Sequence, residues 1–115
     1  MNRNFRLTQS TDFKRVRRSG KSYAHPLVVL VVLVAEGETT RIGVTAGKAI
    51  GKAVQRNRAK RLLREALRPL LPNIKPGLKI LLIARNPILT ANLAEIHDNL
   101  YQLFTKTNLM IDIHE

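Results

Sequence analysis

The sequence predicts one mixed α/β domain whose elements follow the order αββαβα. Two aliphatic runs, residues 27–34 and 78–84, have the short, nearly unbroken apolar pattern of buried strands. Two longer segments, residues 53–68 and the stretch after Thr90, instead place apolar residues at helical intervals. The chain has 115 residues, the usual length of one domain, and no repeat or linker divides it, so we expect residues 1–115 to form a single domain.

The first half of the chain predicts a short helix followed by two strands. A possible cap at Thr8 or Ser10 begins the helix, and Gly20 follows its last residues as a stop. The run at residues 27–34 predicts the first strand, and residues 40–45 alternate apolar with polar or small residues as a second. Because a short acidic turn containing glycine separates the two strands, we expect them to pair as an antiparallel hairpin.

The second half predicts a helix, a strand and a last helix. Pro69 ends or kinks the helix at residues 53–68, because proline disfavours the helical conformation in the residue before it. A loop rich in proline leads to the strand at residues 78–84, which Asn86 and Pro87 break. Thr90 can cap the last helix. The apolar stripe of this helix consists of Leu93, Ile96, Leu100, Leu103 and Phe104.

The charge of the chain indicates a polyanionic partner. Lys and Arg number 20 against 8 Asp and Glu, a net charge of +12 that far exceeds what solubility requires. The absence of Cys excludes disulfides and thiolate metal sites, which fits a reducing compartment. The longest apolar run is too short for a membrane span, and the basic N-terminus leads into polar residues, so we expect no membrane partner, no secretory signal and a cytoplasmic location.

Most of this charge is concentrated around the helix at residues 53–68. The segment from Lys48 to Arg68 contains eight basic residues and one acidic residue, Glu65. The repulsion among these positive charges must therefore be relieved by a negatively charged partner. At about 100° per residue the cations of the helix form one arc, opposite an apolar face of Ala59, Leu62, Leu63, Ala66 and Leu70. The candidate residues for binding a polyanion are Lys48, Lys52, Arg56, Asn57, Arg58, Lys60, Arg61, Arg64 and Arg68.

The choice of arginine, and the glycines before the helix, favour a nucleic-acid ligand. A guanidinium group bonds phosphate oxygens in pairs and also stacks on bases. Gly43, Gly47 and Gly51 would let the backbone approach a ligand closely, although they could equally shape turns. A solvated basic surface with no fixed partner remains the alternative interpretation of the charge pattern.

One motif in this basic segment resembles a known family. Residues 53–65, Ala-Val-x-Arg-Asn-Arg-x-Lys-Arg-x-x-Arg-Glu, resemble the RNR signature of the bacterial ribonuclease P protein family. The resemblance extends over nearly the whole chain. It includes Arg6-Leu7, Asp12-Phe13, Arg18-Ser19-Gly20 and Ile83-Ala84-Arg85.

The resemblance implies a fold, partners and a second RNA surface. The implied fold is an α/β sandwich, a small mixed sheet packed by helices, with an uncommon left-handed β-α-β crossover. The RNR helix and its preceding loop would bind ribonuclease P RNA. A cleft between the sheet and the first helix would hold the single-stranded 5′ leader of precursor tRNA. The implied cleft positions are Phe13, Arg17 and Val31.

The chain departs from the family pattern at the cleft and in the loop. Many relatives carry aromatic residues at the positions of Arg17 and Val31, so we expect weaker stacking of leader bases and a larger share of phosphate contacts. Gly47 and Ala49 stand where a serine and a lysine are common, and they cannot supply those side-chain contacts.

The acidic residues and histidines do not predict a protein nuclease, which would need a metal-binding carboxylate cluster or a histidine pair. Glu95 and Asp98 share a helix with His97, but an exposed helix face explains them better than a metal site, and His25 has no carboxylate near it in sequence. The other grouping is Asp112, His114 and Glu115 in the tail. We therefore expect no catalytic and no metal-binding residue in the protein, and assign the hydrolysis to the RNA partner, with Mg²⁺ bound mainly by that RNA and the substrate.

Two other functions fit the same charge. A ribosomal or other structural rRNA-binding protein would share the size, the charge and the lack of an active site. A DNA-binding module could use residues 53–68 as a recognition helix and would prefer particular duplex sequences. The specificity of the motif favours the subunit of a tRNA 5′-processing endoribonuclease over both, with no obligate protein partner.

Overall fold

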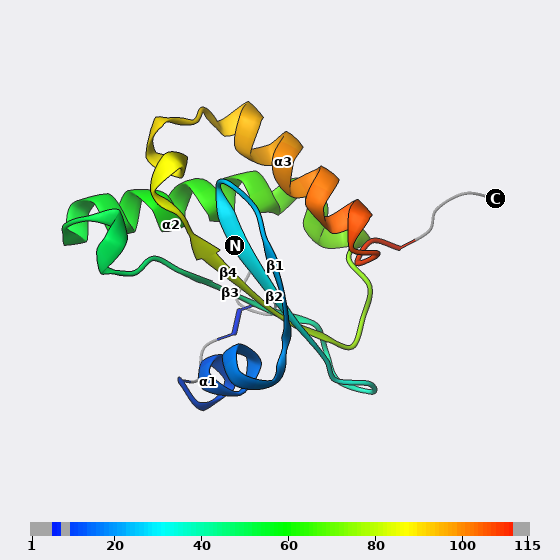
Figure 1. Cartoon of the computed structure of the whole chain (residues 1–115). Helices are drawn as coiled ribbons and strands as arrows, with labels where there is room; N and C mark the ends of the chain where they lie inside the picture. The colour runs from blue at the N-terminus through cyan, green and yellow to red at the C-terminus, as the bar shows by residue number, and fades with distance from the viewer. Residues whose placement is uncertain (1–5, 8–9, 112–115) are drawn as a thin grey trace.

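The computed structural model describes residues 6–7 and 10–111 and shows a four-stranded sheet with helices on both faces (Figure 1). Each of the six predicted elements is present. One short strand that was not predicted, β1, precedes the other strands. Short 3-10 helices (η2 to η4) fill three of the connections. The main elements are α1 (Ser10–Ser19), β1 (Lys21–Ala24), β2 (Val28–Val34), β3 (Arg41–Thr45), α2 (Ala53–Leu67), β4 (Leu78–Ala84) and α3 (Leu93–Lys106).

The strands lie in the order β1-β2-β4-β3. β2 pairs antiparallel with β1 and with β4, whereas β3 pairs parallel with β4. The sheet is therefore mixed, and β3, α2 and β4 form the crossover unit for which the resemblance implies a left-handed path.

The predicted hairpin between the strands at residues 27–34 and 40–45 is wrong, because β4 lies between them. β2 and β4 are both seven residues long and pair along their whole length, which gives β2 more cross-strand pairs than it could form with the five-residue β3. The connection after β2 is also fastened to the start of β4. The N–H of Ala35 donates to the carbonyl of Gly77, and the Thr40 hydroxyl accepts from the N–H of Leu78.

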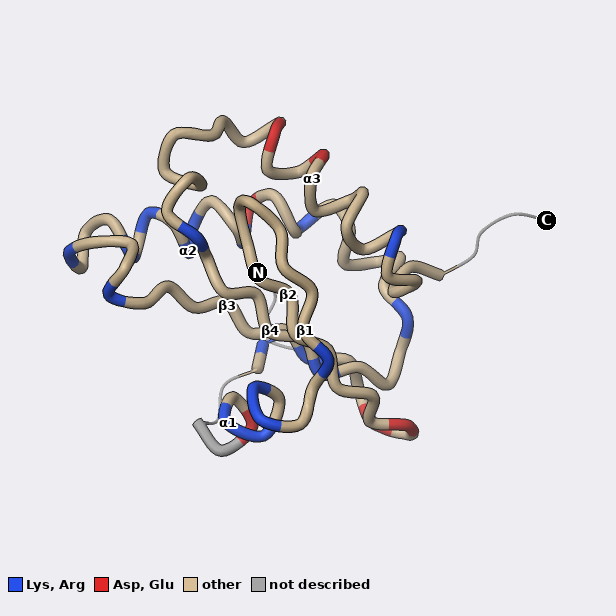
Figure 2. Tube along the Cα trace, in the orientation of Figure 1, with Lys and Arg blue, Asp and Glu red and all other residues tan. Residues whose placement is uncertain are grey.

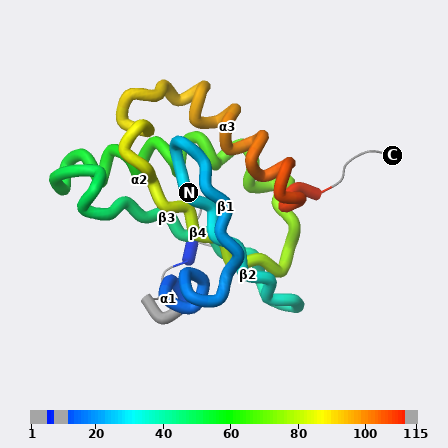
Figure 3. Tube along the Cα trace, viewed as in Figure 1, coloured from blue at the N-terminus to red at the C-terminus, as the bar shows by residue number. Residues whose placement is uncertain are grey.

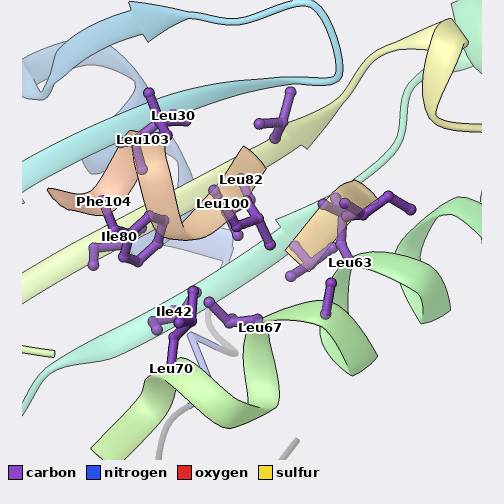
Figure 4. Close-up of a cluster of buried hydrophobic side chains, with 14 of the residues drawn as sticks. Leu30, Ile42, Leu63, Leu67, Leu70, Ile80, Leu82, Leu100, Leu103 and Phe104 are labelled. Carbon is purple, nitrogen blue, oxygen red and sulfur yellow. The ribbon is translucent and has the colours of Figure 1, made fainter. Parts of the chain in front are cut away.

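α2 and α3 pack side by side on one face of the sheet and bury the main core. Figure 4 shows side chains from both helices meeting the strands there, with Leu63 and Leu67 from α2 and Leu100 and Phe104 from α3. Phe104 is completely buried. Alternate residues of each strand supply the sheet side of this core: Leu30, Ile42, Ile80 and Leu82.

Among the described residues, α1 and a small second core cover the opposite face of the sheet. Val16 of α1 is completely buried against Val31 and Leu81, the strand residues that point away from α2. Gly20 ends the helix where a Cβ atom would lie 2.8 Å from Cγ1 of Val31, so a larger residue would push α1 off the strand. The sheet thus has one face under two helices and one face under a single short helix.

Helix ends follow local hydrogen bonding. α2 ends at Leu67, which confirms the prediction that Pro69 ends or kinks this helix, and Pro69 itself lies in a 3-10 helix that follows. α3 begins at Leu93 with Asn92 as its cap, so the prediction that Thr90 caps this helix is wrong. Asn92 and Glu95 exchange hydrogen bonds as a capping box, while the Thr90 hydroxyl donates to the carbonyl of Pro87. The predicted cap at Thr8 lies outside the described residues.

No helix in the described part of the chain is long and apolar enough to cross a membrane.

Candidate nucleic-acid interface

The basic residues of α2 fall into two rows because its apolar face is clamped to the sheet and to α3. The buried residues of α2, Ala59, Leu63, Ala66 and Leu67, fix how the helix is rotated. An outer row of three arginines and one asparagine points to solvent and extends one residue past the end of α2: Asn57, Arg58, Arg61 and Arg68. A flank row is half-buried: Arg56, Lys60 and Arg64. The predicted single arc is thus present, but its flank is partly covered.

The outer row keeps most of its charge available. Arg68 forms an ion pair of 2.8 Å with Glu65, the one acid of the helix. No ion pair engages Arg58 or Arg61 within the described residues. Figure 2 shows basic positions along α2 and α1, whereas the acidic positions of α3 lie on the far side of the helix pair. The electrostatic attraction for a polyanion is therefore directed toward α1 and α2.

The loop before α2 is held in a defined shape. Lys48 and Lys52 are both exposed, and Lys48 begins the short helix η2 (Lys48–Ile50), whose Ile50 is buried. Gly51 has a φ of 134°, a conformation that other residues rarely adopt, so this glycine shapes the turn into the helix. The Gln55 side chain accepts a hydrogen bond of 2.7 Å from the N–H of Lys52 and caps the helix start.

Arg56 fastens this loop to the helix. Its Nε donates a 2.8 Å hydrogen bond to the carbonyl of Gly51, and the terminal nitrogens of the guanidinium have no hydrogen-bond partner in the described part of the chain. Asn86 holds the loop from the other side by donating to the carbonyl of Ala49. These hydrogen bonds thus hold in place the segment that carries Lys48, Lys52 and Arg56.

The glycines before α2 have separate roles. A Cβ atom on Gly43 would lie 2.8 Å from two ring carbons of Phe13, so this glycine makes room for an aromatic side chain of the protein itself. Gly51 is required by its backbone conformation. Gly47 is exposed and has nothing within 4 Å of the position of a Cβ atom, which leaves it as the glycine where a ligand could approach the backbone.

The face beneath α1 offers a partly open apolar platform. Val29, Leu33 and Ile83 are half-buried and pack against the second core, and Phe13 is half-buried beside them. Sequence reasoning missed Val29 and Ile83. The alternation of the strands was the available signal, since both point to the same face as Val31 and Leu81.

The three predicted cleft residues occupy different environments. Phe13 lies at the margin of the platform, and Arg17 is exposed in the last turn of α1. Val31 is only 2% exposed beneath α1, so its side chain supports the platform from within and does not face solvent. The surface available to a ligand beside α1 therefore consists of the half-buried aliphatic residues, Phe13 and the cations of α1.

A pocket of about 240 Å³ lies where this platform meets the outer edge of β3. Arg64 reaches it from α2, and desolvation together with the nearby charge of Arg6 lowers the pKa of the Arg64 guanidinium. The residues lining the pocket are Arg6, Leu7, Phe13, Ile42, Gly43, Val44 and Arg64. Two larger cavities lie away from α2, around the acidic turn at residues 36–38.

The two described histidines and Glu95 of α3 have structural partners. Glu95 caps α3, the Nδ1 atom of His97 lies 3.1 Å from the carbonyl oxygen of Ala66, and His25 accepts from the N–H of Leu27. No group of three or more His, Cys, Asp or Glu that could hold a metal ion occurs in the described ranges. Asp112, His114 and Glu115 lie outside them.

Comparison with known proteins identifies relatives along the whole chain. Residues 1–108 match the family described as Ribonuclease P. The ribonuclease P protein component of Herpetosiphon aurantiacus is 38% identical over 97% of this chain and 91% of its own length. That of Symbiobacterium thermophilum is 40% identical over 96% of both chains.

Solved structures of the same kind of protein share the fold. The RNase P protein of Staphylococcus aureus superposes with a TM-score of 0.79 at 27% identity, covering 92% of this chain and 97% of that one. The RNase P protein of Thermotoga maritima gives a TM-score of 0.76 at 26% identity, covering 88% and 96%. With its basic α2 helix, its mixed sheet and these full-length relatives, the chain belongs to the ribonuclease P protein component family, whose function is the 5′ maturation of tRNA.

Proposed function

We propose that this chain binds the catalytic RNA of ribonuclease P through α2 and its preceding loop, and holds the 5′ leader of precursor tRNA on the open sheet face beside α1. The observation that carries the proposal is the outer row of α2. Arg58 and Arg61 of this row are free of acidic partners within the described residues, while the opposite side of the same helix is locked into the core. Such a helix cannot rotate to hide its charge.

The catalytic RNA is the better partner for the outer row. Arg58 and Arg61 project from a rigid helix, and Lys48 and Lys52 lie on a braced loop at its N-terminal end. A rigid array of cations suits a folded RNA whose phosphates have fixed positions, because little conformational freedom is lost on binding. Guanidinium groups add paired hydrogen bonds to phosphate oxygens.

The platform beside α1 suits a single strand. Half-buried Val29 and Ile83 offer apolar contact, Phe13 can stack on one base, and Arg17 can meet a phosphate. Because Val31 is buried, it adds no stacking surface, so phosphate contacts carry a larger share of leader binding than in relatives with more aromatic residues.

The protein's part in the reaction is electrostatic and geometric. We assign phosphodiester hydrolysis to the RNA, with Mg²⁺ held mainly by that RNA and by the substrate. The protein lowers the repulsion between two polyanions and positions the leader, which raises the affinity for substrate and for metal ions. A ribonucleoprotein that matures tRNA acts where tRNA is transcribed, which in a bacterium is the cytoplasm.

Cleavage of a precursor tRNA tests this division of labour. We expect this protein with its cognate RNA to cleave at low Mg²⁺, the RNA by itself to need more Mg²⁺, and the protein by itself to be inactive. Cleavage by the protein without RNA would contradict the proposal. Co-purification separates it from a ribosomal role, since the protein should follow one noncoding RNA with tRNA-processing activity and not a ribosomal subunit.

A further inference from the structure

The pocket at the outer edge of β3 brings together two arginines from distant parts of the chain. Residues 6–7, the isolated dark-blue segment in Figure 3, extend the sheet beyond β3, where Arg6 bridges to Ile42 in parallel and the N–H of Leu7 donates to the Ile42 carbonyl at 3.0 Å. Arg64 reaches the same pocket from the flank row of α2. We propose that Arg6 and Arg64 together bind one phosphate group of an RNA backbone at this edge.

The Nε atom of Arg64 is the first argument for an anion. It is buried, and no acceptor for it exists among the described residues. Arg56, in the same row, differs because its Nε donates to the carbonyl of Gly51. A buried donor without an acceptor costs free energy comparable to a lost hydrogen bond, which a ligand oxygen would recover.

The charge of the pocket is the second argument. Arg6 is close enough to depress the pKa of Arg64, and no acid lines the pocket. The exposed guanidinium of Arg6 and the partly desolvated guanidinium of Arg64 repel each other, and a phosphate between them converts that repulsion into two sets of charge-assisted hydrogen bonds. The uncharged lining, with Phe13 and Gly43, leaves room for the adjoining sugar.

This inference rests on the proposed function but adds a residue outside the basic arc of α2. Arg6 is far from Arg64 in sequence, and the parallel bridge to Ile42 is what brings its backbone to the edge of the sheet. The phosphate could belong to the catalytic RNA or to the leader, since both carry the same group. The edge of β3 lies between the α2 surface and the α1 platform, so either strand can reach it.

Inorganic phosphate is the direct probe of the free protein. We expect the Nε–H signal of Arg64 in a nitrogen-15 NMR spectrum to shift saturably as phosphate replaces chloride at constant ionic strength. The Nε–H signals of Arg58 and Arg61 should shift less and without saturation. Arg6→Ala should weaken phosphate binding at Arg64 about tenfold, the effect of losing one charged hydrogen-bonding partner. Equal shifts at all three arginines, or no effect of Arg6→Ala, would overturn the inference.

Binding to RNA then identifies the source of the phosphate. The affinity for RNA is compared among three variants, Arg6→Ala, Arg64→Ala and the double variant. In the first arm, the protein binds cognate ribonuclease P RNA. In the second arm, the assembled holoenzyme binds precursor tRNA or leaderless tRNA. Because the two arginines share one phosphate, the double variant should lose little more affinity than either single variant in the arm that supplies it. Lys106→Ala, at the end of α3, is the matched loss of one exposed positive charge and should change neither arm.

The outcomes separate this inference from the proposed function. Additive losses, or no loss in either arm, contradict a shared phosphate. If Arg58→Ala with Arg61→Ala still weakens binding to the catalytic RNA in the same experiment, the proposed function stands and the shared site alone is wrong.

Discussion

The two faces of the sheet are built from the same strands but are covered very differently. One face lies under α2 and α3 and contains the larger core, whose side chains, Leu63 and Phe104 among them, are almost entirely buried. The other lies under α1 alone, and Val29, Leu33 and Ile83 remain half-exposed there. The first face supplies the stability of the fold, and the second retains apolar surface that a ligand can cover.

This difference explains how so small a protein could present the two RNA surfaces that we propose. The covered face makes α2 rigid, so its outward cations have fixed positions. Leaving the second face partly open costs little stability, because a small core is enough to hold α1 on the sheet. This core has four buried residues: Leu7, Val16, Val31 and Leu81. Substitutions on the two faces should therefore have different consequences, stability on one and RNA binding on the other.

The largest expected effect is the loss of a core side chain on the covered face. Phe104→Ala should lower the free energy of unfolding by about 3–5 kcal/mol, because a completely buried ring is replaced by a cavity. Urea denaturation measures this change. Tyr101→Ala on the exposed side of α3 is the control and should cost under about 0.5 kcal/mol. Similar losses for the two variants would show that the core beneath α3 is not what stabilises the fold.

The next largest expected effect is a loss of RNA binding with no change in the free energy of unfolding. Arg58→Ala with Arg61→Ala should leave unfolding unchanged within about 0.5 kcal/mol and weaken binding to the catalytic RNA, because both side chains are exposed and lie off the apolar face. If about five phosphates are contacted, log K should fall with log salt at a slope near −4 in the original protein, and the double variant should reduce that slope by about 2. A salt titration of RNA binding tests both numbers, and an unchanged slope would argue against phosphate contacts at these positions.

A smaller effect concerns the contact between α1 and β3. Gly43→Ala should destabilise the protein by about 1–3 kcal/mol, because its new methyl group would overlap the Phe13 ring. Gly47→Ala, with open space around it, should be nearly neutral. Thermal unfolding compares them, and combining Gly43→Ala with Phe13→Ala should relieve the clash, so that the two losses do not add. Equal effects of the two glycine substitutions would contradict the packing of Phe13 on Gly43.

The smallest expected effect is a gain on the open face. Val29→Tyr should increase holoenzyme affinity for a precursor with a leader about fivefold and leave leaderless tRNA unaffected, since one stacked base contributes about 1 kcal/mol at the lower limit. Equilibrium binding to the two substrates measures the difference. An equal gain for both would place the leader elsewhere.

The sequence predicted elements with strong periodicity well. The strand at residues 78–84 has the predicted bounds, because a nearly continuous apolar run between a Pro-Gly turn and Asn86 admits few other structures. The basic helix ends where proline requires it. Strand β1 was missed, since three of its four residues are exposed and give no apolar signal.

What the sequence could not predict depends on contacts between distant residues. The pairing of β2 with β4 joins strands that are far apart in the chain, and local turn residues do not indicate such a pairing. The burial of Val31 follows from where α1 crosses the sheet. The approach of Arg6 to Arg64 follows from a bridge at the sheet edge. For the same reason, the basic arc was predictable, but its division into outer and flank rows was not.

Site-directed cross-linking tests the separation of the two RNA surfaces most directly. The chain has no cysteine, so a single introduced cysteine carries a photoactivatable group at one known place. Three exposed positions sample the outer row, the open sheet face and the outward side of α3: Asn57→Cys, Ala24→Cys and Asp98→Cys. In the holoenzyme with precursor tRNA, we expect Asn57→Cys to cross-link to the catalytic RNA, Ala24→Cys to the 5′ leader and Asp98→Cys to neither. Cross-links to the catalytic RNA that are as strong from Asp98→Cys as from Asn57→Cys would contradict the account.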